Sequence, residues 1–298
     1  RDYYASRGLG DVYKRQMKKN MTIDIICPLY DAENYIENLN KSIIKQKKVE
    51  INSIKYVLTK GKDNTESLLK KLKCEYTIIS PSEFSHSYTR EMMAKKCTGD
   101  IIVFISQDIK ILRNDWLYYL TKDIVEGNCE AAYSRQLAEK NNIEKYTREK
   151  NYPDKSFVKT KKDIGSMGLN TFFFSDASSA IKRSVFCKLG YYDGKKFASN
   201  EDQYIAYKLI MNGYRIKYCA ESEVVHSHKF SFKSLYKRYH DTGEFYRAEP
   251  YMNTFGTNKA GAGMAKYILK RIVEDRNIVA ALEFMPNMLA RFLGMKLK

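Results

Sequence analysis

Short apolar runs alternate with longer amphipathic segments along the first half of the chain. Continuous apolar runs predict four buried strands, at residues 23–27, 54–58, 76–79 and 101–105. Apolar positions at the helical spacing predict helices between them, at residues 32–45, 66–73 and 87–96. We expect Pro28 to end the first strand, because proline has no N–H for the ladder. Strands that alternate with helices in this way are typical of an α/β fold with a mostly parallel sheet flanked by helices.

The pattern is less regular in the second half. Residues 115–162 read as helical and polar, and the charged stretch 139–162 predicts either a mobile loop or lid or a plain surface insertion. Further strands are expected at residues 172–174 and 215–218, with an amphipathic helix between them at 202–212. We therefore place one α/β domain at about residues 17–230.

From about residue 231 to residue 298 the chain becomes a basic, aromatic and helical extension. Cations such as Lys266, Lys270 and Arg276 stand among apolar residues that recur every three or four positions. Such a stripe usually packs on the main domain, but beside cations it also suits the headgroup layer of an anionic membrane. The sequence leaves both interpretations open.

The first sixteen residues, RDYYASRGLGDVYKRQ, fit no periodic pattern and precede Met17. They resemble a translated sequencing-adapter read-through known from metagenomic assemblies. We expect Met17 to be the natural start and leave residues 1–16 out of the fold prediction.

Composition and charge exclude several classes of protein and indicate the kind of partner. The chain has 298 residues, 44% of them hydrophobic, and a mean hydropathy of -0.53, which excludes low-complexity and polytopic membrane proteins. The net charge of +17 points to a phosphate-bearing partner: nucleic acid, an anionic membrane surface or a nucleotide-linked substrate. Six scattered cysteines and no recognisable secretory signal predict a reducing, cytoplasmic location. We find no run of about 18 apolar residues that would predict a membrane span.

Polar residues follow the predicted strands at their carboxyl ends, where α/β sheets bind ligands. Asp108 comes shortly after the 101–105 strand, so its carboxylate can hold a divalent cation that bridges a diphosphate, or it can simply cap the next helix. His226 and His228 end a later apolar run with the spacing that puts two side chains on one face of a strand. Such imidazoles can bind a metal, although most histidines are ordinary polar residues.

Two further pairs place charge on predicted helices. Glu201 and Asp202 are adjacent at the start of a helix, where the helix dipole stabilises acids. Adjacent residues do not share a helix face, so one acid can cap the helix while the other points into a cleft and takes a proton from a hydroxyl. His86 and Arg90 are four residues apart and would present cations to a phosphate or a sugar.

These residues belong to an ordered series of motifs. The series consists of Cys27-Pro28-Leu29-Tyr30 with Asn34, Phe84-Ser85-His86 with Thr89-Arg90, Phe104-Ile105-Ser106-Gln107-Asp108, Tyr133-Ser134-Arg135-Gln136, Phe174-Ser175-Asp176-Ala177-Ser178-Ser179-Ala180-Ile181, Glu201-Asp202-Gln203 and Val225-His226-Ser227-His228. In this order the chain resembles the inverting family 2 glycosyltransferases of the GT-A fold, and most closely their rhamnosyltransferase-like branch. The similarity spans about residues 23–246.

The resemblance implies a GT-A (Rossmann-like) domain that uses a nucleotide-diphospho-sugar. The donor-binding residues that it implies are Pro28, Tyr30, Thr59, Asp63, His86, Arg90, Gln107 and Asp108. Asp108 and His226 would hold Mg²⁺ or Mn²⁺, with Gln107-Asp108 in the place of the family's DxD motif. Asp202, or else Glu201, would be the base of a single inverting displacement. The acceptor would be a glycan or a lipid-linked glycan of a cell-surface polysaccharide.

Rhamnose is the expected sugar. The loop at residues 59–65, Ser87 and Glu91 depart from the family pattern, which leaves galactofuranose, N-acetylhexosamine and glucose as alternatives. From another class, the aromatic and basic stretch 229–247 suits nucleic acid through phosphates and stacked bases. No nucleic-acid motif accompanies it, and acids at the strand ends would repel a polyanion. We therefore expect a cytoplasmic enzyme, held peripherally at the inner face of the plasma membrane if the extension docks there.

Overall fold

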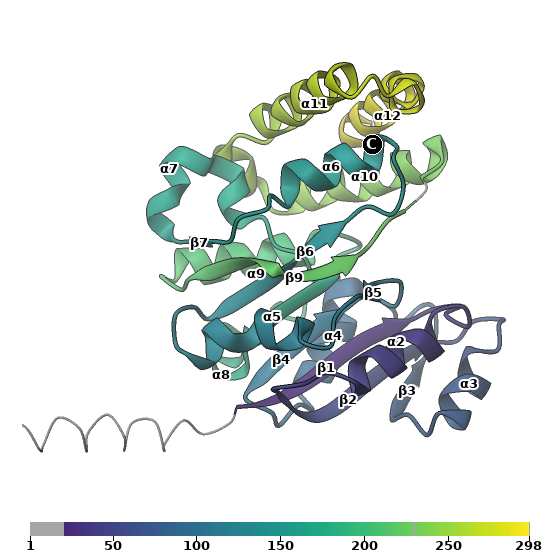
Figure 1. The fold of residues 1–298 in the computed structure, drawn as a ribbon. Coiled ribbons are helices and arrows are strands. Elements are labelled where there is room, and N and C mark those ends of the chain that lie inside the picture. The colour runs from purple at the N-terminus through teal and green to yellow at the C-terminus, as the bar shows by residue number, and fades with distance from the viewer. Residues whose placement is uncertain (1–20, 229, 298) are drawn as a thin grey trace, which may run out of the picture.

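The computed structural model describes residues 21–228 and 230–297, so the predicted leader at residues 1–16 lies outside the described residues. Within them one mixed sheet has the order β3-β2-β1-β4-β8-β6-β9-β5, with β7 paired to β9 (Figure 1). The strands are β1 (Thr22–Leu29), β2 (Glu50–Thr59), β3 (Tyr76–Ile79), β4 (Ile101–Ile105), β5 (Lys110–Ile111), β6 (Ala131–Leu137), β7 (Phe157–Lys159), β8 (Ser178–Lys182) and β9 (Ile216–Val225).

Helices cover both faces of this sheet and one of its ends. The α-helices are α2 (Ile36–Ile44), α3 (Thr65–Lys71), α4 (His86–Ala94), α5 (Trp116–Val125), α6 (Ile143–Asn151), α7 (Ile164–Met167), α8 (Arg183–Lys188), α9 (Glu201–Met211), α10 (Phe232–Ala248), α11 (Thr257–Glu274) and α12 (Ile278–Lys296). Three short 3₁₀ helices are η1 (Lys161–Asp163), η2 (Gly168–Phe172) and η3 (Pro250–Phe255).

The first half of the sheet is parallel, as the alternation of strands and helices predicts. Strands β3, β2, β1 and β4 are neighbours and all run the same way. The second half is mixed, because β8 pairs antiparallel to both β4 and β6. An α/β fold with one large sheet flanked by helices is thus confirmed, its first half parallel as predicted and its second half mixed. The carboxyl ends of β1, β2 and β4 meet at one edge of the sheet.

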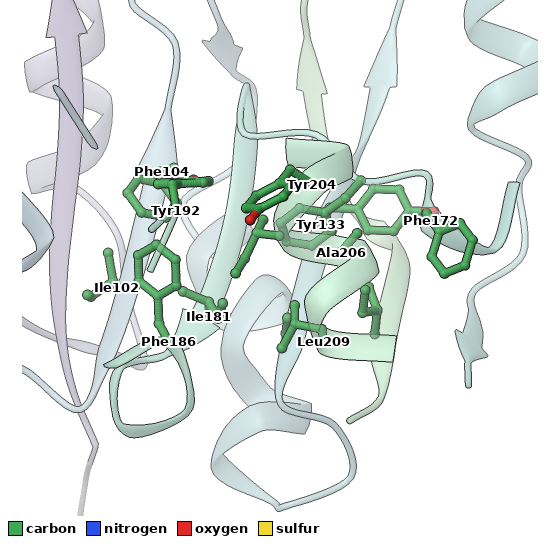
Figure 2. Close-up of a cluster of buried hydrophobic side chains, with 14 of the residues drawn as sticks. Ile102, Phe104, Tyr133, Phe172, Ile181, Phe186, Tyr192, Tyr204, Ala206 and Leu209 are labelled. Carbon is green, nitrogen blue, oxygen red and sulfur yellow. The ribbon is translucent and has the colours of Figure 1, made fainter. Parts of the chain in front are cut away.

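The strand IIVFI shows how the sheet is buried on both faces. Ile101, Val103 and Ile105 contact one apolar cluster, which includes Trp116 of α5. Ile102 and Phe104 point to the other cluster, in which Tyr133, Phe186 and Leu209 also lie (Figure 2). Side chains alternate between the two faces of a strand, so a continuous apolar run is the pattern that a doubly covered strand needs.

The structure corrects two sequence-based predictions for the strands and adds a strand that the sequence does not predict. Pro28 does not end β1, which continues to Leu29 and pairs with β2 throughout. The pairing of β1 with β4 stops at Ile26, so the strand has one neighbour at Pro28 and tolerates a missing N–H there.

The strand expected at residues 172–174 is instead the end of η2 and the coil after it, and the neighbouring strand is β8. Phe172 and Phe174 are buried by aromatic packing, not by sheet pairing; the ring centroids of Phe172 and Phe255 are 4.7 Å apart. Strand β6 was not predicted, because Ser134 and Gln136 interrupt its apolar pattern. Both polar side chains are buried and hydrogen-bonded inside the molecule.

The charged stretch 139–162 is not a loop or lid: it contains α6 and β7. Tyr146 of α6 and Lys159 of β7 are fully buried. Ile143 and Tyr146 form a small third cluster with Ile268 and Ile272 of α11 and Ala280 of α12. The few apolar residues of this stretch therefore have partners from the far end of the chain, which a local sequence window does not reveal.

The helices α10, α11 and α12 lie together beside α6, at the end of the molecule farthest from β3 (Figure 1). Helix α10 begins at Phe232, close to the predicted start of the extension. Helices α10 and α12 cross closely where a Cβ at Gly294 would lie 2.5 Å from the carbonyl oxygen of Tyr236. Ile268 and Ile272 of α11 and Ala280 of α12 pack on Ile143 and Tyr146 of α6, so the extension packs on the α/β domain, as one of the two interpretations expects.

The apolar stripe of the extension nevertheless has a second, exposed part. Helix α12 is long and apolar enough to cross a membrane by length and composition alone, with a mean hydropathy of 1.3 and 17% of that window buried. This finding corrects the expectation that no segment meets that criterion. The large apolar side chains that stay exposed on α11, on α12 and just beyond it are Leu269, Val273, Ile278, Val279, Leu282, Met285, Leu289, Phe292 and Leu297.

Candidate active site

A cavity of about 1880 Å³ opens at the carboxyl ends of β1, β2 and β4 and continues beneath α10, α11 and α12. Nearly all the sequence-predicted site residues line it: Pro28, Tyr30, Thr59, His86, Arg90, Gln107, Asp108, Glu201, Asp202 and His226. Asp63 is the exception. The fold therefore brings together residues that are far apart in the sequence.

Asp63 orders the loop after β2 and does not line the cavity. Its Oδ2 accepts hydrogen bonds from the Glu33 N–H (2.8 Å) and the Thr65 hydroxyl (2.8 Å), and its Oδ1 accepts one from the Thr65 N–H (3.0 Å). Burial alone would raise the pKa of Asp63, but these hydrogen bonds to the charged form lower it overall. The side chain thus holds the start of α3 against the end of β1.

Gln107 and Thr59 differ in how their polar atoms are used. The Gln107 amide makes two hydrogen bonds with the backbone of Tyr30: Oε1 accepts from its N–H (2.8 Å) and Nε2 donates to its carbonyl (2.9 Å). Gln107 therefore fixes the chain after β1 against the chain after β4. The Thr59 hydroxyl is buried and has no hydrogen-bond partner among the described residues, although its side chain lines the cavity. A buried polar group of this kind is expected to find a ligand or water.

Asp108, His226 and His228 form the cluster that can hold a metal ion. Their ligand atoms all lie within 4.8 Å of one another. The His226 Nε2 and the His228 Nδ1 each lie 3.5 Å from a different oxygen of Asp108. Burial lowers the pKa of both histidines, that of His228 to about 4, so both are neutral at pH 7 and can offer a nitrogen lone pair.

Gln136 of β6 holds His226 in this orientation. The Gln136 Oε1 lies 2.8 Å from the His226 Nδ1 and also accepts a hydrogen bond from Arg148 of α6. Its Nε2 donates to the Ser175 hydroxyl (2.8 Å). Because Arg148 can only donate, its contact fixes the oxygen end of the amide toward His226. Since Oε1 can only accept, Nδ1 carries the proton and Nε2 is left free toward Asp108.

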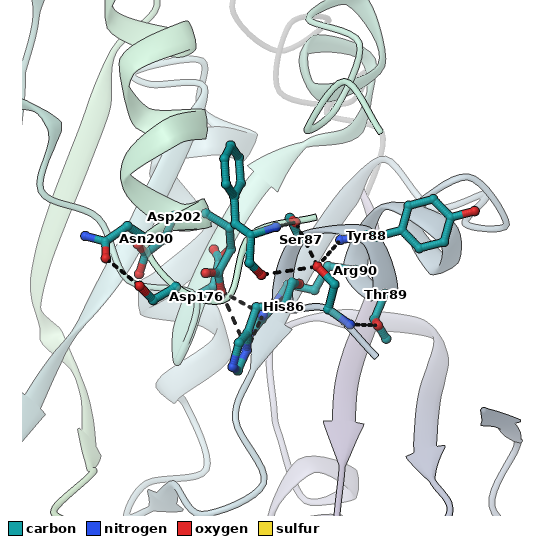
Figure 3. A network of polar contacts seen from close by, with 12 residues as sticks. His86, Ser87, Tyr88, Thr89, Arg90, Asp176, Asn200 and Asp202 are labelled. Atoms are coloured by element: carbon teal, nitrogen blue, oxygen red, sulfur yellow. Dashed lines mark hydrogen bonds and ion pairs between the residues drawn. The ribbon is translucent and has the colours of Figure 1, made fainter. Parts of the chain in front are cut away.

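On the other side of the cavity, Glu201 is neutralised by Arg90. The Arg90 Nη1 donates to the Glu201 Oε1 (2.9 Å) and to the His86 carbonyl (3.0 Å), and both charged side chains are buried (Figure 3). Arg90 comes from α4 and Glu201 from the start of α9, so the ion pair joins two helices. Glu201 is thereby committed to a structural contact.

Asp202, the next residue, has no cation partner among the described residues. Asn200, before the pair, adopts the left-handed conformation (φ 63°), which turns the chain sharply into α9. Asp202 is half-buried and lines the cavity, and its Oδ1 accepts from the Gln203 N–H (2.7 Å). Burial raises the pKa of Asp202 well above its usual range, and the charges of Glu201 and Asp176 add to the effect.

Asp176 is the third acid of this group. It is fully buried and accepts hydrogen bonds from the Ser179 hydroxyl (2.6 Å) and the Tyr192 hydroxyl (2.7 Å). Burial raises its pKa as well, against the opposing charge of Arg90. A carboxylate with a raised pKa in a cleft is a candidate general base. Asp202 differs from Glu201 in having no cation partner among the described residues, and from Asp176 in having no side-chain hydroxyl bound to its carboxylate.

Helix α10 brings cations to the cavity from above. Lys237 pairs with Asp241 and Arg247 with Glu244. Burial is the main cause that lowers the pKa of His86, His226 and His228, and the charge of Arg238 contributes in the same direction at each. The Arg238 guanidinium is therefore within electrostatic reach of both sides of the cavity.

Sequence reasoning missed three residues of this site, Gln136, Asp176 and Arg238, and raised His228 as a possible metal ligand through its His-x-His spacing. Gln136 and Asp176 lie within motifs quoted above. The contact of Gln136 with His226 joins two strands and has no local signal. Arg238 is one of many cations in a basic helix, and only the fold distinguishes it.

Comparison with known proteins gives the family. Residues 24–190 match the Glycosyl transferase family 2 domain. The O-antigen chain rhamnosyltransferase RfbN of Salmonella typhimurium is 32% identical over 251 residues, which cover 82% of this chain and 78% of that protein. The O-antigen chain rhamnosyltransferase WbaN of Salmonella anatum is 32% identical over 204 residues, covering 67% of this chain and 64% of that one.

Solved structures share the fold at lower identity. The mannosyltransferase PcManGT from Pyrobaculum calidifontis, in complex with GDP-Man and Mn²⁺, superimposes with a TM-score of 0.58 at 16% identity, covering 97% of this chain and 92% of that one. Residues 1–349 of TarS from S. aureus, in complex with UDP-GlcNAc, give 0.53 at 12% identity, with coverages of 93% and 91%. The chain is a member of glycosyltransferase family 2 and has the GT-A fold that its motifs predict.

Proposed function

We propose that this enzyme transfers rhamnose from a nucleotide-diphospho-sugar to a glycan acceptor during synthesis of a cell-surface polysaccharide, with inversion at the anomeric carbon. The rhamnosyltransferase relatives support the sugar and the pathway class. The observation that carries the chemistry is that the unpaired carboxylate of Asp202 and the Asp108, His226 and His228 cluster line one cavity at the strand ends.

The donor lies across the carboxyl ends of β1, β2 and β4. The free Thr59 hydroxyl faces the nucleoside, which also contacts Pro28 and Tyr30, the latter 53% exposed. Gln107 keeps this wall in place through the Tyr30 backbone, while His86 and Arg90 form the opposite wall. The diphosphate is directed toward Asp108. Asp63 does not contact the donor, and its role is to order the loop that begins at Thr59.

The residues of the cluster fit a divalent cation. One carboxylate and two neutral imidazoles are a mixed oxygen and nitrogen set, which suits Mn²⁺ better than Mg²⁺, since Mg²⁺ strongly prefers oxygen ligands. Asp108, His226 and His228 would hold it, with Gln136 fixing the tautomer of His226. When bound, the ion offsets the negative charge that builds on the departing diphosphate.

Asp202 deprotonates the acceptor. Its Oδ2 takes the proton of the attacking hydroxyl, which displaces the nucleoside diphosphate from the opposite face of the sugar. The raised pKa makes this carboxylate a stronger base than an exposed aspartate. Glu201 positions Arg90 and the start of α9 and does not take the proton, because its carboxylate is paired with the Arg90 guanidinium.

The extension brings the enzyme to the membrane that carries the acceptor. The exposed apolar residues of α11 and α12 recur at helical spacing, and exposed Lys266, Lys270 and Arg276 accompany them. A basic protein with such a face binds an anionic lipid surface. The cavity extends beneath these helices, so that a lipid-linked glycan can reach Asp202 from the membrane at the cytoplasmic side.

A donor panel tests the proposal. The full chain is incubated with Mn²⁺, a rhamnose-terminated or galactose-terminated acceptor set, and nucleotide-linked rhamnose, galactofuranose, N-acetylglucosamine or glucose. Release of nucleoside diphosphate that requires both acceptor and the rhamnose donor supports it. Turnover with another donor alone would assign a different sugar to the same site.

A further inference from the structure

The cations around the cavity differ in how their charge is compensated. Most have an acid or several polar partners: Arg90 with Glu201, Arg148 with Glu144, Lys237 with Asp241, Arg247 with Glu244, and Arg291 with Tyr239, Asn287 and Thr147. Arg238 has none of these. Within residues 21–228 and 230–297 it forms no ion pair, and the contact that its guanidinium makes is with an aromatic ring.

That ring connects Arg238 to the metal-ligand cluster. The Arg238 Cζ lies 5.5 Å from the ring centroid of Phe230, whose ring lies 5.2 Å from that of His228. The rings of His228 and His226 are 4.5 Å apart. An exposed guanidinium stacked on Phe230, at the end of this series of rings, is held near the cluster instead of moving freely in solvent.

A metal ion at the cluster would leave part of the negative charge of the diphosphate uncompensated. A divalent ion held by one carboxylate has a net charge of +1, whereas a nucleoside diphosphate carries two to three negative charges that grow as the sugar bond breaks. A guanidinium can form two parallel hydrogen bonds to phosphate oxygens and keeps its charge at any physiological pH. An aspartate or glutamate partner would compete with phosphate for these donors, and the fold provides none.

We propose that Arg238 binds the sugar-linked phosphate of the donor and stabilises the diphosphate as it leaves. This assignment rests on the proposed function, and it makes α10 part of the catalytic unit. The catalytic part supplies the metal ligands and the base, while the extension supplies the second positive charge on the leaving group. Loss of the guanidinium therefore weakens binding of ligands that have the second phosphate and spares those that lack it.

The test compares R238Q with K233Q by calorimetry in the presence of Mn²⁺. Lys233 is exposed on the same helix and does not line the cavity, so K233Q removes an equal charge away from the site. The ligands are UDP, GDP and dTDP and the matching monophosphates. We expect R238Q to weaken binding of the preferred diphosphate by about 10- to 100-fold, with less than a twofold change for the monophosphate and for K233Q.

Two further results would bear on the assignment. R238K keeps the charge but not the paired donors, so its loss should be intermediate. An R238Q variant that binds the diphosphate as the wild type does, or that loses the monophosphate equally, would overturn the role of Arg238 while leaving the proposed function intact. A wild-type protein that binds none of the nucleotides would instead contradict the proposed function, and Arg238 with it.

Discussion

Two adjacent acids at the start of α9 have different surroundings. Glu201 is buried against Arg90, whereas Asp202 faces the cavity with one oxygen free. We expect D202N to lower the turnover number by about a hundredfold or more, because a general base is lost, with donor binding little changed. E201Q should retain more activity but lower the free energy of unfolding by about 1–3 kcal/mol, because Arg90 loses its counter-charge.

Initial rates, nucleotide affinity and thermal unfolding of the two variants separate these effects. If E201Q were inactive and D202N active with normal stability, the roles of the two acids would be reversed.

The pH dependence of turnover follows from the raised pKa of Asp202. Burial raises it, the negative charges of Glu201 and Asp176 raise it further, and Arg90 opposes them. A base works when it is deprotonated, so kcat should fall as the pH drops through this raised pKa, above the value of about 3.9 for an exposed aspartate. D176N removes one neighbouring negative charge and should move the acid limb of the profile to lower pH. E139Q, which changes an exposed acid outside the cavity, is the control, and equal profiles for D176N and the wild type would refute the coupling.

At the scale of elements, the hydrophobic pattern predicts a strand well where every position along the strand is buried. The runs at β1 and β4 are predicted nearly to the residue because both faces of these strands are covered. The edge strand β3 is also predicted to the residue, although its Ile78 is exposed. The pattern fails at β6, where Ser134 is satisfied by partners from β8 and β9 that lie 44 and 88 residues later, and Gln136 by Arg148 of the next helix, α6. The candidate site divides in the same way: acids and histidines at element ends are found by motif, whereas Gln136 and Arg238 depend on contacts between distant elements.

Burial of part of one aromatic and basic stretch weakens the argument for nucleic-acid binding, although its Phe232 is 46% exposed. The aromatic and basic stretch 229–247 forms α10 over most of its length, and Phe245 and Tyr246 are buried. The Tyr246 hydroxyl donates to Gln203 of α9 (2.8 Å). Aromatic rings committed to the core cannot stack on bases.

The crossing of α10 and α12 gives a prediction about this element pair. A Cβ at Gly294 would meet the Tyr236 carbonyl at 2.5 Å and the His240 nitrogen at 2.9 Å, both backbone atoms that cannot move aside independently. G294A should therefore lower the free energy of unfolding by about 1–3 kcal/mol. At Gly263 of α11 a Cβ meets open space, so G263A should be neutral or stabilise the protein by up to about 1 kcal/mol. Denaturant unfolding of both variants measures the difference, and equal stability would argue against the close crossing.

At the scale of the whole molecule, the extension has two faces. Its inner face packs on α6 and lines the cavity, while its outer face exposes apolar residues such as Leu282 (76% exposed) and Met285 (70%). Removing the extension would open the cavity and expose Ile143 and Tyr146, so point variants test membrane binding more cleanly than truncation does. The division of the chain into a domain at residues 17–230 and an extension at residues 231–298 stays a prediction.

We expect the double variant L282E/M285E to lose binding to anionic vesicles by at least tenfold, because two charges would enter the headgroup layer. I44E introduces a charge at an apolar residue that is 65% exposed on α2, away from the extension, and should bind as the wild type does. Co-sedimentation with vesicles of phosphatidylglycerol and phosphatidylcholine gives the measurement. Equal, weak binding by all three proteins would favour packing as the sole role of these helices.

The central claim is that the cluster at the end of β4 and the cation above it hold the diphosphate of a nucleotide-sugar opposite Asp202. A crystal structure with Mn²⁺ and the preferred nucleoside diphosphate, with anomalous diffraction to locate the metal, tests it most directly. The account predicts one anomalous peak bound by Asp108, His226 and His228, with a diphosphate oxygen as a further ligand and the free oxygen of Asp202 facing the vacant sugar position. A peak elsewhere, or a nucleotide bound with its diphosphate away from these residues, would contradict it.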